Sequence, residues 1–393
     1  MTTEFDVVIL GAGAAGLMCA MVAGGRGRRV LLLDHAEEPG KKILISGGGR
    51  CNFTNLHCMP DRFISDNPHF CRSALARYSQ QDFISLVEKH AIAYHEKTLG
   101  QLFCDGSAKA ILRMLLDECA AVGVDLRLSH NVTAMTKAER FRITTDRGDF
   151  SAPSVVLATG GLSIPKMGAT NFAHRIAQQF GLPLTETRPG LVPLKFSDQD
   201  IALMRPLSGL SVDVMAHRGP ATFRENLLFT HRGLSGPAIL QISSYWHPGE
   251  DIQIDLLPDQ DAMAFLRDRK QARPRAELKT VLAEIFPKRF ADALAEMHIP
   301  VSRPLGEIAE RDLAPLAEML NHWRLTPSGT EGYGKAEVTV GGIATTALSS
   351  QTMQANRVAG LYVIGEAVDV TGWLGGYNFQ WAWSSGWAAG MAV

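Results

Sequence analysis

Three glycines near the start of the chain have the spacing of a phosphate-binding turn. Gly11, Gly13 and Gly16 follow the apolar run 7–10 in the order Gly-x-Gly-x-x-Gly. The first glycine permits a tight turn, the second lets the backbone approach a pyrophosphate, and the third lets the next helix pack on the strand. Asp34 stands 18 positions after Gly16, where an acid accepts hydrogen bonds from adenosine ribose hydroxyls. We therefore predict a dinucleotide site at this turn.

A second glycine-rich stretch follows the acid. Gly47, Gly48 and Gly49 precede Arg50 within the segment 39–55. Successive glycines disfavour helix and strand, and in a loop they leave backbone donors exposed. We predict that this segment is a loop that lies against a flat ligand. The alternative is a flexible surface loop.

The C-terminal part of the chain carries nucleotide-type features again. Glu366 follows an apolar run and a glycine, where an acid can accept a hydrogen bond from a ribityl or ribose hydroxyl. Gly375 and Gly376 precede a final helix, and we expect its N-terminus to point at the N1–C2=O edge of a flavin. There the helix dipole would stabilise the negative charge of the reduced ring. Because such features occur at both ends of the chain and not in its middle, the sequence predicts an FAD domain built from discontinuous segments.

The predicted cofactor is non-covalently bound FAD. A second nucleotide fingerprint is absent from the sequence, so NAD(P)H as the electron donor would bind transiently on the open face of the flavin. A protein or quinol donor is the alternative. The predicted cofactor-binding residues are Gly11, Gly13, Ala14, Ala15, Gly16, Asp34, Lys42, Ser46, Gly47, Gly48, Gly49, Arg50, Cys51, Asn52, Thr159, Gly160, Gly365, Glu366, Gly375, Gly376, Tyr377 and Asn378.

Three residues are candidates for catalysis. Arg50 can clamp a phosphate or polarise a carbonyl, and a structural salt bridge is its alternative role. His231 can polarise a substrate carbonyl or donate a proton, or it is simply a loop histidine. Tyr377 can donate a proton, although aromatic residues at such a place more often pack the flavin loop.

An α/β fold with a Rossmann-like core must position these residues. The apolar run 7–10 and the segments 28–34 and 155–161, which end in an acid and in a glycine pair, predict strands of a parallel sheet, with a helix over 17–23. Helical spacing predicts one helix over 73–90 and another over 107–122. Alternating residues over 125–150 predict a small antiparallel meander.

The middle of the chain has a different character. Frequent proline and glycine with period-two alternation predict an inserted β-domain, and amphipathic spacing over 261–324 predicts three or four short helices with solvated charges. The predicted domains are an FAD domain over 1–188 and 336–393, an inserted β-domain over 189–260 and 325–335, and a helical subdomain over 261–324.

Composition restricts the classes of partner. Hydrophobic residues make up 46% and charged residues 20% of the chain, and the net charge is −1, so we expect no nucleic-acid partner and no anionic membrane. No apolar run reaches the length of a membrane span, and the cysteines form no Cys-x-x-Cys motif, so we expect a cytoplasmic protein without a metal site. Cys51 and Cys58 leave a disulfide reductase as a less favoured alternative, because their spacing is wider than in that class. The oligomeric state stays open.

Four segments together resemble the BaiN-like (YhiN-like) NAD(P)/FAD-dependent oxidoreductases, namely 11–16, 45–55, 228–237 and 375–382. The resemblance covers nearly the whole chain, and Ser46-Gly47-Gly48-Gly49-Arg50-Cys51-Asn52 is its most specific motif. It implies an FAD domain of the glutathione-reductase superfamily, with an insert that has a β-barrel-like part and a helical part. The member that gives the family its name is associated with reduction of a conjugated double bond in oxo-bile acids.

A shorter segment, 338–343, is similar to the threonine-x-glycine-glycine stretch of fumarate-reductase-type flavoproteins. Both resemblances favour an oxidoreductase that reduces an activated, carbonyl-conjugated C=C bond of a small molecule by hydride transfer from flavin N5, with an acid that protonates the α-carbon. One alternative is a flavin oxidase or monooxygenase. Another is a flavin-binding protein without turnover, such as a redox sensor or a partner in RNA modification.

Overall fold

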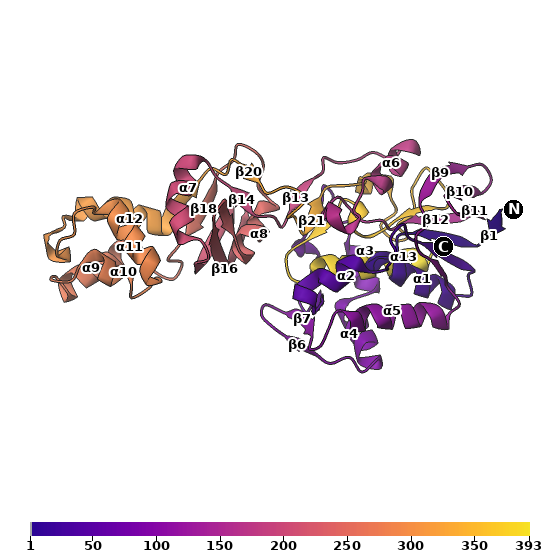
Figure 1. The fold of residues 1–393 in the computed structure, drawn as a ribbon, viewed down its shortest axis with the longest axis horizontal. Helices are drawn as coiled ribbons and strands as arrows, with labels where there is room; N and C mark the ends of the chain where they lie inside the picture. Colours follow the sequence, from indigo (N-terminus) through magenta and orange to yellow (C-terminus); the bar gives the residue numbers. More distant parts are fainter. Residues whose placement is uncertain (1) are drawn as a thin grey trace. The chain divides into compact units, whose positions relative to one another are not determined.

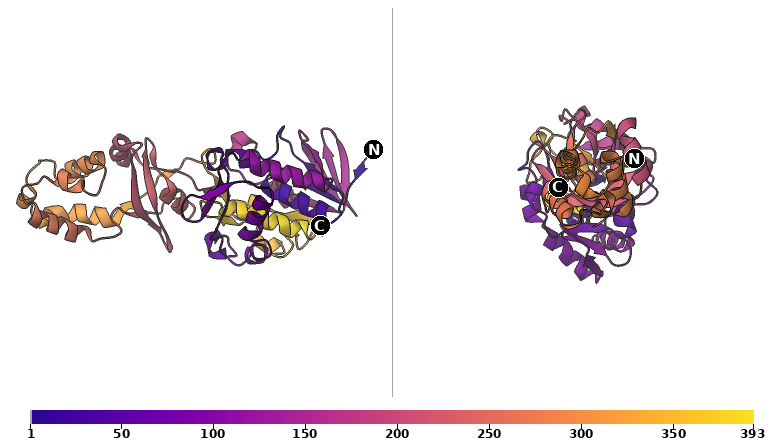
Figure 2. Two further views of the ribbon diagram at one scale, coloured as in Figure 1. Left: turned by 90° about the horizontal axis from the view of Figure 1, so that it is seen from below. Right: turned by 90° about the vertical axis from the view of Figure 1, so that its left-hand side faces the viewer.

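A parallel sheet of five strands forms the centre of the first of two compact units into which the chain folds (Figure 1). The computed structural model describes residues 2–393. The first unit comprises the described residues up to Arg188 together with Val338–Val393, and the second comprises Pro189–Glu337. Figure 2 shows the indigo N-terminal segments and the yellow C-terminal helix together in the first unit.

The strand order of the parallel sheet defines where a ligand can bind. The order is β22 (Leu361–Val363), β12 (Ser154–Leu157), β2 (Val7–Leu10), β3 (Val30–Leu33) and β8 (Asp125–Arg127). The chain passes from β2 to β3 and β8 on one side, and returns to β12 and β22 on the other. Open α/β sheets bind ligands beyond the carboxyl ends of their strands at such a reversal. Every residue of β2 and β3 is buried, as expected for a sheet covered on both faces.

Three helices share one hydrophobic core with this sheet: α1 (Ala14–Gly25), α5 (Lys109–Ala121) and α13 (Tyr377–Gly390). The two ends of the chain meet where α13 packs on α1. A Cβ atom on Gly386 would lie 2.5 Å from the carbonyl oxygen of Ala15, so this contact requires glycine. The strands predicted over 7–10, 28–34 and 155–161 and the helix predicted over 17–23 are confirmed, although β3 covers only Val30–Leu33 and β12 ends at Leu157.

Smaller sheets and helices complete the first unit. β4, β7 and β6 form one antiparallel sheet, β1, β11, β10 and β9 form a mixed sheet, and β5 pairs with β23. The bounds are β1 (Thr3–Glu4), α2 (Lys41–Ile45), η1 (Ser46–Gly49), β4 (Asn52–Asn55), η2 (Pro60–Arg62), β5 (Phe63–Ile64), α3 (Arg72–Arg77), α4 (Gln80–Lys89), β6 (Tyr94–Glu96), β7 (Gln101–Cys104), β9 (Val132–Lys137), β10 (Phe141–Thr145), β11 (Gly148–Ala152), η3 (Pro165–Met167), α6 (Phe172–Gln179), β21 (Val338–Val340), η6 (Thr345–Ala347), η7 (Gly365–Ala367) and β23 (Thr371–Gly372).

Three local predictions for this unit need correction. The helix expected over 73–90 is two helices, because Ser79 and Asp82 form a capping box that starts α4. The meander expected over 125–150 begins only at β9, since β8 pairs in parallel with β3. The segment 39–55 is not one loop. Ile43 and Phe53 are buried in the core, and their burial fixes α2 and β4 on either side of the glycines.

The second unit is built on a seven-stranded antiparallel sheet, in the order β19-β18-β15-β16-β17-β14-β20. Its edge strands β19 and β20 are separated by residues 326–328 alone, so the sheet must curl strongly. The bounds are β14 (Leu194–Lys195), α7 (Asp198–Met204), η4 (Arg205–Leu207), β15 (Ser211–Arg218), β16 (Ala221–Thr230), β17 (Gly233–Ser235), α8 (Pro237–Ser243), β18 (Ile252–Asp255), α9 (Ala262–Ala272), α10 (Leu278–Leu282), α11 (Lys288–His298), η5 (Leu305–Glu307), α12 (Glu310–His322), β19 (Trp323–Leu325) and β20 (Gly329–Thr330). A further strand, β13 (Arg188–Gly190), spans the boundary between the units.

The helices of the second unit were only partly foreseen. α9 to α12 lie within the predicted helical stretch and appear in orange in Figure 1. α7 and α8 interrupt the predicted β-region. Ser197 caps α7 by accepting a hydrogen bond from the N–H of Asp200, and Pro237 occupies the first turn of α8.

Candidate functional site

The glycine turn between β2 and α1 combines close backbone contacts with open space. Gly11 has φ +109°, and a Cβ atom there would lie 2.5 Å from the carbonyl oxygen of Ala158. A Cβ atom on Gly16 would lie 1.9 Å from the carbonyl oxygen of Gly11. A Cβ atom on Gly13, the N-cap of α1, would instead meet nothing within 4 Å. The open position in front of a helix N-terminus is the arrangement that accepts phosphate groups.

Asp34 is fixed at the end of β3 by the backbone. Its Oδ2 accepts a hydrogen bond from the N–H of Ala12 at 2.7 Å, and its Oδ1 accepts one from the N–H of Ala36 at 2.8 Å. Each carboxylate oxygen keeps a further lone pair. The carboxylate is therefore held beside the glycine turn and can still accept a ribose hydroxyl.

The three successive glycines form an irregular turn after α2. Gly47, Gly48 and Gly49 have φ values of +56°, +67° and +86°, in the left-handed region that glycine adopts without strain. Gly48 has open space around its Cβ position. Arg50 is exposed, whereas Cys51 is buried with φ +54°. The predicted Asn52 begins β4 rather than continuing a loop.

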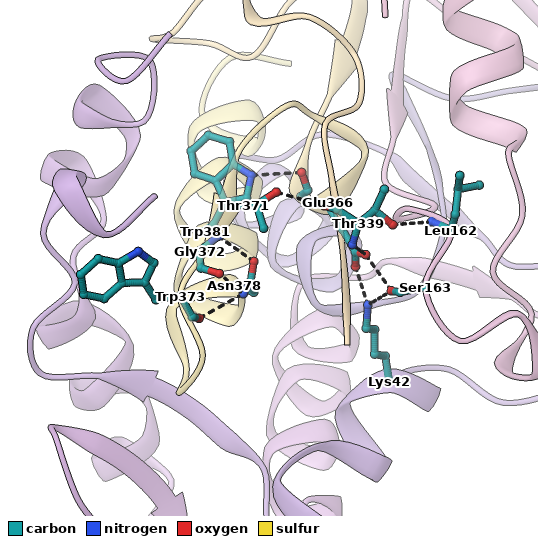
Figure 3. Close-up of polar contacts among 11 residues, drawn as sticks. Lys42, Leu162, Ser163, Thr339, Glu366, Thr371, Gly372, Trp373, Asn378 and Trp381 are labelled. Atoms are coloured by element: carbon teal, nitrogen blue, oxygen red, sulfur yellow. Dashed lines mark hydrogen bonds and ion pairs between the residues drawn. The ribbon is translucent and has the colours of Figure 1, made fainter. Parts of the chain in front are cut away.

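A polar network joins α2, the segment after β12, strand β21 and the segment after β22 (Figure 3). The ammonium of Lys42 donates to Oε2 of Glu366 at 2.5 Å and to the hydroxyl of Ser163 at 2.6 Å. Ser163 donates to Oε1 of Glu366 at 2.8 Å, and the N–H of Thr339 donates to the same oxygen at 2.9 Å. Thr339 Oγ1 accepts from the N–H of Leu162 at 2.8 Å. These contacts bring four distant segments to the carboxyl ends of the parallel strands.

Glu366 is ionised in this network. Burial acts to raise the pKa of its carboxyl, but the Lys42 ammonium and the hydrogen bonds from Ser163 and Thr339 together hold the pKa below its usual value. The carboxylate oxygens already accept three hydrogen bonds, so orientation of Lys42 is the role that the geometry displays. The predicted contact of Glu366 with a ribityl or ribose hydroxyl stays a prediction.

The segment after β12 contains a polar atom without a partner. The Oγ1 atom of Thr159 is buried, and it has no hydrogen-bond partner among residues 2–393. Gly160 beside it has φ +75° and open space at its Cβ position. An orphaned hydroxyl beside open backbone is what a nucleotide-binding cradle requires, since buried polar groups are otherwise paired. The residues present thus fit a dinucleotide such as FAD.

The side chain of Asn378, in the first turn of α13, closes the loop that precedes this helix. Asn378 accepts from the N–H of Gly372 at 2.8 Å and donates to the carbonyl of Gly372 at 2.8 Å. Gly376 caps the helix with φ +96°, and a Cβ atom there would lie 2.3 Å from the carbonyl oxygen of Thr54. The indole of Trp381 donates to the carbonyl of Gly365 at 3.0 Å, which ties α13 to the segment of Glu366 (Figure 3).

The candidate catalytic residues lie on different units. Arg50 is an exposed residue of the first unit. Tyr377 is buried there, and its ring packs edge-on against Phe63 and Trp373. His231 belongs to the second unit, in the turn between β16 and β17. The catalytic roles of all three stay predictions.

Two residues of the network and one buried histidine near it were not among the predicted site residues. Ser163 and His174 stand outside any motif, and Thr339 belongs to the segment 338–343, whose threonine-x-glycine-glycine pattern was noted without a role for the threonine. His174 is buried with no partner for Nε2 in the described part of the chain. Burial lowers its pKa, and the charge of Glu366 acts in the opposite direction. The threonine-x-glycine-glycine pattern was the one available signal.

The cysteines argue against the disulfide-reductase alternative. All six are free and buried. Burial raises the pKa of Cys51 and of Cys58 to about 12. Reactive cysteines have lowered pKa values, because the thiolate is the attacking species.

Residues 2–393 contain no group of three or more histidine, cysteine and acidic side chains that could hold a metal ion. No helix within this range has the length and apolar character that crossing a membrane requires.

Known proteins resemble this chain over its whole length. Residues 5–392 match the family described as "HI0933-like protein Rossmann domain". The chain is 53% identical over 387 residues to the ribosomal RNA dihydrouridine synthase of Escherichia coli K12, which covers 98% of this chain and 97% of that protein. It is 30% identical over 405 residues to the 3-dehydro-bile acid delta(4,6)-reductase of Clostridium scindens, with 98% of each chain covered.

A solved structure supports the fold alone. The 3-ketosteroid-delta4-(5alpha)-dehydrogenase of Rhodococcus jostii RHA1 superposes with a TM-score of 0.52, covering 99% of this chain and 97% of that one at 14% identity.

Proposed function

Since the chain belongs to the HI0933-like Rossmann family of flavoproteins, we propose that it reduces the C5=C6 double bond of a uridine in ribosomal RNA. The prediction of an FAD-dependent oxidoreductase is confirmed by that membership. The observation that carries the finer proposal is the 53% identity, over nearly both full chains, to a ribosomal RNA dihydrouridine synthase.

The chemistry of uridine agrees with the predicted reaction. The C5=C6 bond of uracil is conjugated with the C4 carbonyl, so it is an activated alkene of the kind expected from the sequence. A hydride added at C6 and a proton added at C5 give dihydrouridine. A relative that acts on a bile acid and one that acts on ribosomal RNA thus share the reduction of a carbonyl-conjugated double bond.

The residues that would hold FAD lie at the carboxyl ends of the parallel strands. Gly13 and the N-terminus of α1 would take the diphosphate, Asp34 the adenosine ribose, and Gly48 and Gly376 the flavin side. When bound, FAD would supply a hydride from its N5 atom. We propose NADH or NADPH as the electron donor.

The chain itself must polarise the uracil carbonyl and provide a proton. Arg50 presents an exposed guanidinium that can donate hydrogen bonds to a carbonyl oxygen. Tyr377 can hold a proton at Oη, and His231 can hold one at a ring nitrogen. We propose one of these two as the donor to C5.

An RNA substrate changes the expectation about partners. The net charge of −1 argued against a nucleic acid, but that argument concerns the average over the chain and not a local surface. We propose a cytoplasmic enzyme in which the second unit is the β-barrel-like and helical insert of a BaiN-like protein. A small molecule with an enone is the second candidate substrate, favoured by the 30% identity to the bile acid reductase.

One assay separates the two substrates. The full-length protein with FAD is incubated without oxygen with NADH or NADPH and with ribosomal RNA transcribed in vitro. Nuclease digestion and mass spectrometry then seek uridine heavier by two hydrogen atoms. The Escherichia coli relative is the positive control, and a 4-en-3-one steroid is the competing substrate. Reduction of the steroid without any dihydrouridine would overturn the RNA proposal.

A further inference from the structure

Lys42 and Glu366 come from segments that both touch the glycine turn. The N–H of Gly40, which precedes α2, donates to the carbonyl of Ala12 at 2.9 Å. A Cβ atom on Gly365 would lie 3.0 Å from the Cβ of Ala15, in the first turn of α1. The ion pair between Lys42 and Glu366 is therefore anchored on both sides beside the turn where a diphosphate is expected.

The lysine is only partly used by the protein. An ammonium has three N–H groups, and the described contacts of Lys42 employ two, one to Glu366 and one to Ser163. The side chain of Lys42 is 41% exposed, against 19% for Glu366. One donor of a fixed ammonium thus remains available at the more exposed end of the pair.

The carboxylate, by contrast, already accepts three hydrogen bonds. Its oxygens accept from Lys42, from Ser163 and from the N–H of Thr339. The Lys42 ammonium neutralises a negative charge that would otherwise repel a phosphate at this place, and the two neutral donors stabilise it further. Glu366 and Ser163 therefore hold the lysine in one orientation, and pre-organised charges bind at a lower entropic cost.

Neighbouring segments provide the rest of an anion site. Gly13 leaves open space at the N-terminus of α1, and Thr159 has a buried hydroxyl without a partner in the described chain. Phosphate oxygens are strong acceptors for an ammonium, a hydroxyl and helix N–H groups. We infer that Lys42 contacts the diphosphate of FAD, and that Glu366 and Ser163 are positioning residues for it. This inference requires FAD binding but does not depend on the RNA reaction.

The test compares ligands that differ in the diphosphate. Full-length protein freed of flavin is titrated with FAD, ADP, adenosine and riboflavin, and the dissociation constants are measured by calorimetry or flavin fluorescence. Lys42→Gln should weaken FAD and ADP about 10- to 100-fold, the range of a charge-assisted hydrogen bond. Adenosine and riboflavin should change by less than about twofold, because they lack the diphosphate. Lys42→Arg should retain most of the affinity.

Matched variants separate binding from folding. Lys41→Gln, on the same helix, is the control and should leave all four constants unchanged. Lys42→Gln also leaves Glu366 without its cation, so the double variant Lys42→Met with Glu366→Met removes both charges together. If Lys42 is the ligand, the double variant stays weak for ADP.

Two outcomes would overturn the inference. Recovery of ADP affinity in the double variant would show that the loss came from an uncompensated carboxylate. An altered flavin midpoint potential with unchanged ADP affinity would place the lysine at the flavin ring. Neither outcome bears on whether uridine is reduced, which the RNA assay decides separately.

Discussion

Glu366 in the first unit and Glu225 in the second are both withdrawn from water, yet their surroundings shift the pKa in opposite directions. Glu366 is held below its usual value by Lys42, Ser163 and Thr339 against the effect of burial. Burial raises the pKa of Glu225, and the hydrogen bond from Gln241 only partly offsets it. Glu225 forms no ion pair with another described residue.

The surroundings of Glu366 and Glu225 show how a proposed ligand site differs from an acid that is withdrawn from water only by the packing of its neighbours. The contacts of Glu366 join residues up to 324 positions apart, and they leave a lysine donor facing outward. Glu225 is a residue of β16 bonded to the nearby helix α8. The ion pair of Arg224 with Asp259, next to Glu225 in the second unit, lies on the surface. A neutralised network with one unused donor is the arrangement that we propose for a ligand, whereas a single half-buried acid without a cation costs stability.

The largest effect expected within the first unit separates the fold from ligand binding. Gly16→Ala places a Cβ atom 1.9 Å from the carbonyl oxygen of Gly11, so we expect a loss of at least about 3 kcal/mol or failure to fold. Gly13→Ala meets nothing within 4 Å, so the flavin-free protein should keep its melting temperature. Its FAD affinity should fall about tenfold or more, which corresponds to about 1.4 kcal/mol.

Scanning calorimetry and FAD titration check both variants. An unchanged FAD affinity in Gly13→Ala would show that the glycine turn does not contact the cofactor. An unchanged melting temperature in Gly16→Ala would show that the turn tolerates a side chain. The close contact of Gly16 with Gly11 would then not be required for folding.

The next effect tests the ionised state of Glu366. Its folded pKa is lowered, so its contribution to stability is fully present above the unfolded pKa of about 4.3 and is lost as pH falls through the folded value. Glu366→Gln should therefore destabilise the flavin-free protein at pH 7 by about 1–2 kcal/mol, a value reduced because Lys42 is partly exposed. The difference from the native protein should shrink at acid pH below about 4.3.

Thermal unfolding between neutral and acid pH measures this. Glu37→Gln, at an exposed position, is the control and should track the native protein. A Glu366→Gln deficit that stays constant down to the lowest accessible pH would mean that the carboxylate is not the source of the stability.

The sequence allowed the backbone of the site to be predicted better than its side chains. The turn at Gly11, the acid at Asp34 and the strand before Glu366 follow from local patterns, because glycines and apolar runs act over a few residues. The hydrogen-bond partners of Glu366 do not follow from local patterns. Ser163 lies 203 positions away, and nothing in its surroundings marks it before the strands are paired.

The same reason explains the errors in the fold. β8 was assigned to a meander because its neighbours in sequence alternate, but its parallel pairing with β3 is a long-range choice. The break at Ser79 had a local signal, the capping box with Asp82, which the apolar spacing on either side obscured. Sheet membership and polar networks are decided by tertiary contacts, whereas turns and caps are decided by adjacent residues.

The smallest expected effect concerns Glu225, and it is opposite in sign to the stability effect expected for Glu366. An acid with a raised folded pKa binds its proton more tightly in the folded state, so its ionisation lowers stability as pH rises above the unfolded pKa of about 4.3. Glu225→Gln cannot ionise. It should therefore stabilise the second unit at pH 8 by a few tenths to about 1 kcal/mol, with the gain vanishing at acid pH. Glu307→Gln, at an exposed position of the same unit, should show no such trend. Calorimetry of both variants between acid pH and pH 8 measures this difference in stability.

If Glu225→Gln destabilised the protein at pH 8, as Glu366→Gln is expected to do at pH 7, then Glu225 would also belong to a compensated network. The contrast between the two units would then have to be sought in their ligands and not in their carboxylates.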